Sequence, residues 1–85
     1  MEREKVGEVF KYWGKIGVAG IKITEGFIQA GDTIQIQGAT TNFEQKVESI
    51  QIEKAPIEKA MKGQTIGMKV VSEVRPGDSV YKIKK

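Results

Sequence analysis

The sequence predicts an all-β domain, a small barrel or sandwich, from a repeated turn motif and from the choice of apolar residues. Three times a glycine is followed by Asp or Gln, a hydroxyl residue and a β-branched residue: Gly31-Asp32-Thr33-Ile34, Gly63-Gln64-Thr65-Ile66 and Gly77-Asp78-Ser79-Val80. Glycine supplies the positive φ of a tight turn, and the Asp or Gln side chain can bond nearby backbone. Each motif therefore predicts a turn that starts a strand.

The apolar residues favour strands over helices. The chain contains 11 Ile and 8 Val but no Leu. Leu is a good helix former, whereas Ile and Val lose little χ1 freedom in a strand. A chain of 85 residues has room for one domain that buries roughly 60 to 65% of its unfolded surface. We expect a single domain over residues 1–85, with flexible ends at 1–4 and 84–85.

The first half of the chain predicts strands over residues 5–13, 16–23 and 33–37. Gly14 separates the first two strands, and the apolar phase changes beside Gly17 and Gly20, which predicts a bulge or a sharply coiled strand. Residues 25–31 form a connector with an apolar plug, Phe27 or Ile28. In residues 33–37 the isoleucines alternate with Thr and Gln, so one face of that strand is expected to be exposed to solvent.

The second half predicts strands over residues 43–53, 64–71 and 79–83. The phase changes again near Glu48-Ser49, which predicts another bulge. Pro56 is expected to end the longest strand, and residues 57–63 to form one helical turn closed by Gly63. The expected core is made of the inward-facing apolar residues Val9, Ile21, Ile23, Ile34, Ile36, Val47, Ile50, Ile66, Met68 and Val80.

Composition also limits the chemistry. The chain has no Cys and no His, which removes disulfides, the usual zinc sets and the commonest general base. No apolar run is long enough for a transmembrane helix, and the charged start does not resemble a signal peptide. We expect a cytoplasmic protein with no cofactor, no metal and no catalytic activity. The net charge of +3 permits contact with nucleic acid without requiring it.

Two motifs have plain structural explanations. Gly14, Gly17 and Gly20 suggest a phosphate loop, but no helix follows them to direct amides at an anion, so strand curvature explains them better. Asp32 and Asp78 could act as paired carboxylates. Both occupy the same place after a turn glycine, so capping of the turn explains both of them.

The segment Lys11-Tyr12-Trp13-Gly14-Lys15 is the best candidate for binding chemistry. Cations interleaved with aromatic rings suit a phosphate backbone with unpaired, stacked bases. The alternative is that Tyr12 or Trp13 closes the end of the barrel and that the lysines are merely solvated. The segment alone does not decide between these interpretations.

From about Val6 to Ile83 the chain resembles the second domain of translation GTPases such as elongation factor Tu. Residues 14–23, Gly-Lys-Ile-Gly-Val-Ala-Gly-Ile-Lys-Ile, resemble that family's G-R-G-T-V-V-T-G-R-V strand, and residues 25–32 match its R-G-I-I-K-V-G-E/D segment. Residues 46–50 are similar to its K-V-x-S-I strand, residues 60–67 to its A-x-x-G-x-x-V-G turn, and residues 74–78 to its closing G-D. The resemblance implies a closed barrel of six or seven strands.

A second resemblance is to the C-terminal barrel of the collagenase-like peptidases, a family that includes RNA-modifying enzymes. It is carried by residues 43–50, Phe-Glu-Gln-Lys-Val-Glu-Ser-Ile, and by the closing Val-Arg-Pro-Gly-Asp at residues 74–78. Both families attach this barrel to larger proteins that handle RNA. We expect this chain to act as a stand-alone barrel.

The first resemblance also implies positions for an RNA site. In elongation factors this domain helps to hold the aminoacylated 3′ end of transfer RNA, and the matching positions here are Lys22, Gln51 and Lys54. Each differs from the family's residue, and Ile21 replaces a small glycine beside the pocket. Lysine lacks the flat fork of arginine, and Gln51 carries no charge. Cationic character and shape are retained, whereas specific recognition of a charged transfer RNA end is not implied.

These observations lead to one expected function and one alternative. We expect a non-enzymatic, translation-factor-like module that binds RNA (transfer or ribosomal) or a ribonucleoprotein and does not bind GTP or a membrane. The residues expected to bind RNA are Lys11, Tyr12, Trp13, Lys15, Lys22, Gln51 and Lys54. The alternative is a protein interaction module that docks through a sheet edge or a loop face without nucleic acid.

Overall fold

The computed structural model describes residues 2–52 and 55–84, and it confirms the all-β fold class. In this part of the chain every regular element is a strand. The ten strands are β1 (Glu2–Trp13), β2 (Val18–Ile23), β3 (Phe27–Gln29), β4 (Thr33–Gln37), β5 (Asn42–Lys46), β6 (Ile50–Ile52), β7 (Ala55–Ile57), β8 (Lys59–Met61), β9 (Thr65–Lys69) and β10 (Ser79–Lys84). Across the described residues no helix is long and apolar enough to cross a membrane.

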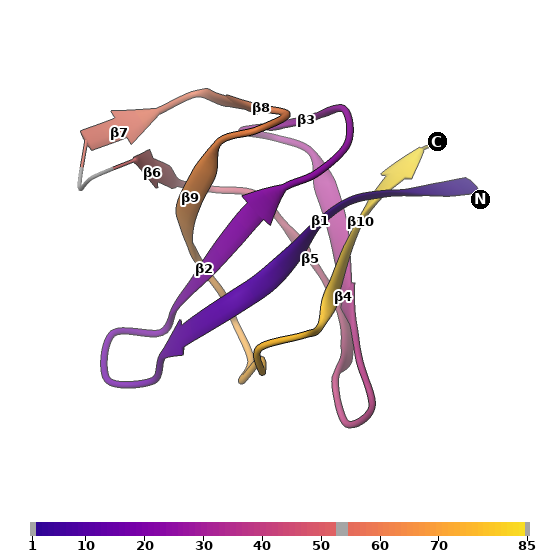
Figure 1. Cartoon of the computed structure of the whole chain (residues 1–85), viewed down its shortest axis with the longest axis vertical. Coiled ribbons are helices and arrows are strands. Elements are labelled where there is room, and N and C mark those ends of the chain that lie inside the picture. Colours follow the sequence, from indigo (N-terminus) through magenta and orange to yellow (C-terminus); the bar gives the residue numbers. More distant parts are fainter. Residues whose placement is uncertain (1, 53–54, 85) are drawn as a thin grey trace.

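Eight of the strands form one antiparallel sheet that curls into a barrel-like shape (Figure 1). The strand order is β5-β4-β10-β1-β2-β9-β6-β7, and β3 and β8 pair separately as a small second sheet. β1 is the longest strand and lies at the centre, between β10 and β2. Residues 2–4, expected as a flexible end, pair with residues 82–84 of β10. Residues 2–4 and 82–84 therefore lie side by side.

The apolar residues fill the inside of the curled sheet as the sequence predicts. All ten predicted core residues are at most 2% exposed. They are joined by residues such as Val6, Ile28, Ala60 and Val74. Ile28, in the predicted connector, is fully buried in β3 and is the expected apolar plug. Alternation of side chains along each strand explains this, because every second residue faces inward.

The three predicted glycine turns share one hydrogen-bonding pattern. Gly31, Gly63 and Gly77 have φ of 96°, 92° and 97°. The residue after each glycine bonds back in both directions to the residue three positions earlier. Its backbone N–H donates to that residue's carbonyl, and its side-chain oxygen accepts that residue's N–H; the pairs are Asp32 with Gln29, Gln64 with Met61, and Asp78 with Arg75. Capping of turns thus accounts for both Asp32 and Asp78.

The predicted helical turn over residues 57–63 is wrong. These residues contribute to β7 and β8, and β8 pairs with β3 so that Ala60 lies opposite Ile28 in the core. Burial of Ala60 stabilises the extended form over an isolated helical turn, which is marginal by itself. Pro56 lies inside β7 rather than ending a strand. β7 is an edge strand, where the missing N–H of proline is tolerated.

Other strand limits differ slightly from the predictions. The predicted strand 43–53 is divided into β5 and β6 by residues 47–49, where a bulge was expected. Its predicted end at Glu53 lies outside the described residues. The predicted strand 16–23 begins at Val18 instead, because residues 13–16 form a turn in which the Ile16 N–H donates to the Trp13 carbonyl at 3.2 Å.

The backbone ladder is open between β5 and β9, in contrast to the closed ladder implied by the family resemblance. β5 and β7 end the strand order. Gln45 of β5 spans the opening: its Nε2–H donates to the Lys69 carbonyl and its Oε1 accepts the Val71 N–H, both at 2.9 Å. One side-chain amide thus joins the two sides where strand pairing is missing.

The turn geometry predicts a contrast between two glycines. Gly77→Ala should lower the free energy of unfolding by about 1 to 2 kcal/mol, because its φ of 97° is strained for an L-residue. A Cβ there would meet no atom within 4 Å, so packing does not contribute. Gly14→Ala, at an exposed glycine without positive φ, should change it by less than about 0.5 kcal/mol. Urea unfolding compares them, and equal effects would contradict the assigned turn.

Candidate functional site

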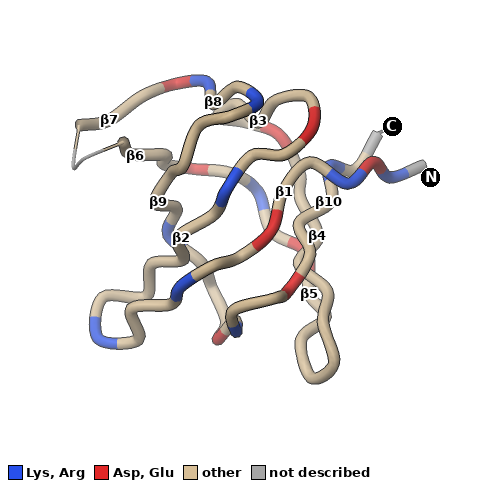
Figure 2. Tube along the Cα trace, in the orientation of Figure 1, with Lys and Arg blue, Asp and Glu red and all other residues tan. Residues whose placement is uncertain are grey.

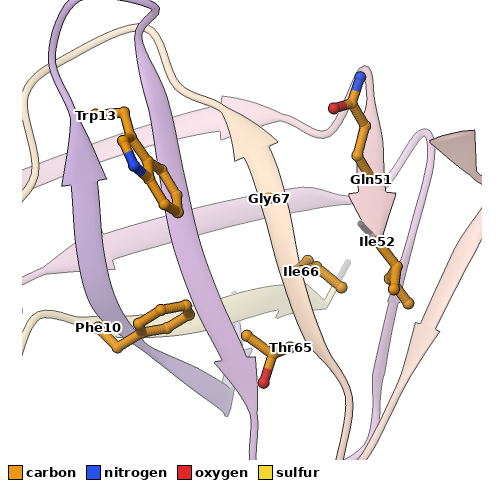
Figure 3. Close-up of a pocket in the computed structure, with 7 residues that line it drawn as sticks. All are labelled: Phe10, Trp13, Gln51, Ile52, Thr65, Ile66 and Gly67. Atoms are coloured by element: carbon orange, nitrogen blue, oxygen red, sulfur yellow. The ribbon is translucent and has the colours of Figure 1, made fainter. Parts of the chain in front are cut away.

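A groove with a volume of about 440 Å³ crosses the outer face of β1, β2, β9 and β6 (Figure 3). Figure 3 shows Phe10 and Trp13 on one side of β9, and Gln51 and Ile52 on the other. The residues that line it are Phe10, Trp13, Gln51, Ile52, Thr65, Ile66 and Gly67. Two residues predicted from sequence, Trp13 and Gln51, therefore lie in one site although they are far apart in the chain.

A β-bulge places both aromatic rings on the same face. In a regular strand Phe10 and Trp13 would point to opposite faces, because side chains alternate. The pairing of β1 with β2 shifts here: Val9 lies opposite Ile21, whereas Lys11 lies opposite Gly20. The extra residue, Phe10, resets the alternation, so Val9 and Tyr12 face the core while Phe10 and Trp13 face out.

The backbone of Gly20 lies under the two rings. A Cβ on Gly20 would come within 2.8 Å of Phe10 Cζ and 3.1 Å of Trp13 Cζ3. Any side chain at position 20 would therefore displace the rings. Gly20 pairs with Gly67 of β9, and Gly67 pairs in turn with Gln51 of β6. Gly20 is buried beneath the rings, so the backbone that lines the groove between its two walls is that of Gly67, where an added Cβ would lie 3.5 Å from Val18 Cγ1.

The polar groups of the groove are uncharged. Gln51 is exposed on β6 and offers an amide, and Thr65 offers a hydroxyl. No residue that lines the groove has an ionisable side chain. Among the described residues there is also no cluster of three or more side chains that could hold a metal ion. The arrangement is suited to binding a flat, partly apolar group and offers no proton donor or acceptor with a tunable pKa.

Lysines stand around the groove rather than in it. Lys11 Nζ lies 5.2 Å from the centre of the Trp13 ring, a cation–π contact. Lys22 is exposed on β2 and pairs with Thr65, which places it at the Thr65 end of the groove. Lys15 is exposed in the turn after Trp13. Positions of Lys and Arg and of Asp and Glu are interspersed along the described part of the chain (Figure 2).

One described lysine has a perturbed pKa, and it is engaged elsewhere. The hydrogen bond from Lys5 to the Glu8 carboxylate, at 2.9 Å, raises the pKa of Lys5 above its usual value. Both side chains are exposed, so the pair adds little to stability. Lys22 lies opposite Glu8 in the β1–β2 ladder. The Glu8 carboxylate, however, forms its ion pair with Lys5.

The structure sorts the residues predicted to bind RNA into three groups. Trp13 and Gln51 line the groove, while Lys11, Lys15 and Lys22 surround it. Tyr12 packs against the core, away from the groove. Lys54 lies outside the described residues.

Sequence reasoning did not find Phe10, Thr65 or Gly67 as residues of the groove. A signal for Phe10 was available, since Phe10 and Trp13 are both large aromatic residues in one predicted strand. Strict alternation would have placed them on opposite faces, and only the bulge brings them together. The sequence places Gly67 in the turn motif of residues 60–67, but it does not show that Gly67 pairs with Gly20.

Comparison with known proteins agrees with this fold. The family model of elongation factor Tu domain 2 matches residues 17–81. The chain belongs to the elongation factor Tu domain 2 family. Both resemblances proposed from the sequence are confirmed. The family model supports the likeness to elongation factor Tu domain 2. The relatives described next support the likeness to the collagenase-like peptidases.

Those relatives are protease-like proteins. The chain is 42% identical over 85 residues to a collagenase of Porphyromonas gingivalis, and 40% identical over 81 residues to an uncharacterized protease of Methanocaldococcus jannaschii. These alignments cover 99% and 94% of this chain but 24% and 20% of the relatives. The chain thus spans about a quarter or less of the curated relatives that it matches.

A solved structure of similar length has a similar fold. The C-terminal domain of a Geobacillus thermoleovorans protein assigned to the U32 peptidases superposes with a TM-score of 0.88 at 25% identity. The match covers 95% of this chain and 93% of that domain. The chain is therefore a translation-factor domain 2-like β-barrel module, similar to the C-terminal domain of U32 peptidase-like proteins.

Proposed function

We propose that this module binds RNA weakly and that an unpaired base occupies the groove beside Trp13. The observation that supports the proposal is the pair of outward-facing rings, Phe10 and Trp13, in one groove with the backbone of Gly67. Phe10 is 47% and Trp13 37% exposed, and both line the same groove. Exposed aromatic rings offer stacking surfaces to bases without selecting a sequence.

The groove suits a nucleobase better than a purely apolar ligand. A base is flat enough to lie over the backbone of Gly67 against the indole of Trp13. Its edges need hydrogen-bonding partners, which the Gln51 amide and the Thr65 hydroxyl can supply. Lys11, Lys15 and Lys22 around the groove can then contact the phosphates on either side of the base.

The proposal assigns binding, not catalysis, to this domain. The protease-like relatives are four to five times longer in sequence, since the match covers 24% and 20% of them. Within a longer protein of this kind, the module would hold the RNA while other parts perform the chemistry. An RNA ligand and a chain without Cys fit a reducing, cytoplasmic location, which forms part of the proposal.

Salt dependence tests the phosphate part of the proposal. If Lys11, Lys15, Lys22 and Lys54 neutralise three or four phosphates of a single strand, the log–log slope of affinity against salt should be roughly −2 to −3. Lys22→Glu should weaken binding of all sequences and reduce that slope by about 0.7 to 1. The matched control is Lys46→Glu on β5, an exposed lysine outside the groove.

Fluorescence anisotropy with a labelled single-stranded RNA measures these slopes at several salt concentrations. Equal losses for Lys22→Glu and Lys46→Glu would show that net charge alone controls binding. No binding at low salt, or binding that does not respond to salt, would favour the protein interaction alternative.

Removal of the Trp13 ring tests the stacking part. Trp13→Ala should cost about 1 to 3 kcal/mol of binding free energy, the usual contribution of a stacked base. Trp13→Phe should recover part of that loss. Because Trp13 is partly exposed, we expect the fold to remain intact, as a far-UV circular dichroism spectrum would verify. RNA affinity that is unchanged in Trp13→Ala would rule out the groove as the base site.

A further inference from the structure

The opening between β5 and the end of β9, here called the seam, has features of a peptide-binding site. β5 has a partner strand, β4, on one side only. β9 pairs with β6 through Gly67 and Met68, and the chain that follows runs along the seam. Gln45 is the residue that spans it, through hydrogen bonds to both Lys69 and Val71.

The amide of Gln45 bonds to the seam in the way a peptide group would. In a parallel ladder, one residue donates to the carbonyl before its partner and accepts from the N–H after it. Gln45 Nε2 donates to the Lys69 carbonyl, and Gln45 Oε1 accepts the Val71 N–H, so the two bonds flank Val70. The side-chain amide thus occupies the place of a neighbouring strand.

The opposite side of the seam also has an available strand edge. The Val47 N–H donates to the Asp32 carbonyl at 2.8 Å. Val47 and Asp32 are therefore a hydrogen-bonded pair at the end of the β4–β5 ladder. Hydrogen-bonded and non-bonded pairs alternate along an antiparallel ladder. The backbone groups of Gln45 therefore face β4, whereas those of Glu44 and Lys46 face the seam.

The surroundings indicate the side chains that a partner would carry. A cavity of about 420 Å³ lies at the seam, lined by Gln45, Lys46, Glu48, Lys69, Val70 and Val71. Val71 is 77% exposed, the highest value among the large apolar side chains of the described residues. Ile16, in the turn held to Val70 by the Gly17 carbonyl, is 64% exposed. Two lysines against one glutamate give the cavity a positive balance.

We propose that the seam is a β-strand-addition site for an extended segment of a partner protein. The segment displaces the Gln45 amide and takes over the bonds to Lys69 and Val71. It bears apolar residues that cover Val71 and Ile16, and carboxylates that meet Lys46 and Lys69. Main-chain hydrogen bonds supply the affinity and alternate side chains the specificity. The site shares no lining residue with the groove, so it can be tested separately from RNA binding.

The test uses the whole chain and a synthetic peptide. The probe is the blocked heptapeptide Asp-Val-Thr-Val-Thr-Val-Asp, which is extended, apolar on alternate residues and acidic at its ends. The control peptide replaces both Thr by Pro, which removes two main-chain donors and leaves length and charge unchanged. In ¹H–¹⁵N spectra the probe should shift the amides of residues 44–46 and 69–71, and the control should not.

Variants at Gln45 test whether its amide is the group displaced. Gln45→Met keeps the length of the side chain and Gln45→Ala removes it, so neither can make the two bonds. Each should bind the probe about fivefold to a hundredfold more tightly, since two ordinary hydrogen bonds no longer have to be broken. If Gln45→Ala does not fold, Gln45→Met carries the comparison.

Three outcomes would overturn the proposal. One is the absence of binding by the parent chain and by Gln45→Met, and another is equal binding of the probe and the proline control. The third is probe binding that shifts Trp13, Gly20 and Gly67 instead of the seam, which would assign the peptide to the groove.

Discussion

The candidate site depends on one close approach, that of the Phe10 and Trp13 rings to the backbone of Gly20. Contact at this distance is possible only where position 20 has no side chain. It also requires the bulge at Phe10, which brings two aromatic residues three positions apart onto one face of β1. Gly20 beneath the rings pairs with Gly67 of β9, which lines the groove, so the rings form one wall of the groove and Gly67 lies beyond them.

The framework that holds this groove is a curled sheet joined by short turns. The three reciprocal turns at Gly31, Gly63 and Gly77 start β4, β9 and β10 and set where each of these strands begins. A strand that slipped by one residue would turn its apolar face outward, so these turns and the buried Ile and Val residues specify the same register. Gln45 replaces strand pairing at the seam, which leaves the curled sheet joined but not closed.

The features that could be predicted from sequence are those with local causes. The alternation of Ile and Val predicted the core, and the glycine motif predicted the turns. Both features depend only on residues that are close together in the sequence. The bulge at Phe10 depends on the partner strand, and so the groove could not be derived from alternation. The error at residues 57–63 has the same origin: Ala60 is extended because Ile28, distant in sequence, lies opposite it. The sequence predicts a strand over residues 43–53 but does not show that the Gln45 amide bonds to the Lys69 carbonyl and the Val71 N–H.

The chemistry of the two surfaces points to a module that binds. The groove offers rings, an amide, a hydroxyl and backbone, with lysines around it and no ionisable group inside. Its membership of the elongation factor Tu domain 2 family and its likeness to a domain of U32 peptidase-like proteins are consistent with a module that serves different larger proteins. In the proposed function, the larger protein supplies the reaction and this domain supplies contact with RNA.

The central claim is that RNA enters the groove between Trp13 and Gly67. The most direct measurement is a ¹H–¹⁵N map of the whole chain titrated with a short single-stranded RNA. The account predicts that the Trp13 indole, the Gly20 and Gly67 amides and the Gln51 side-chain amide shift together and saturate with one affinity. Shifts confined to the seam or scattered over exposed lysines, with these groove signals unmoved, would contradict it.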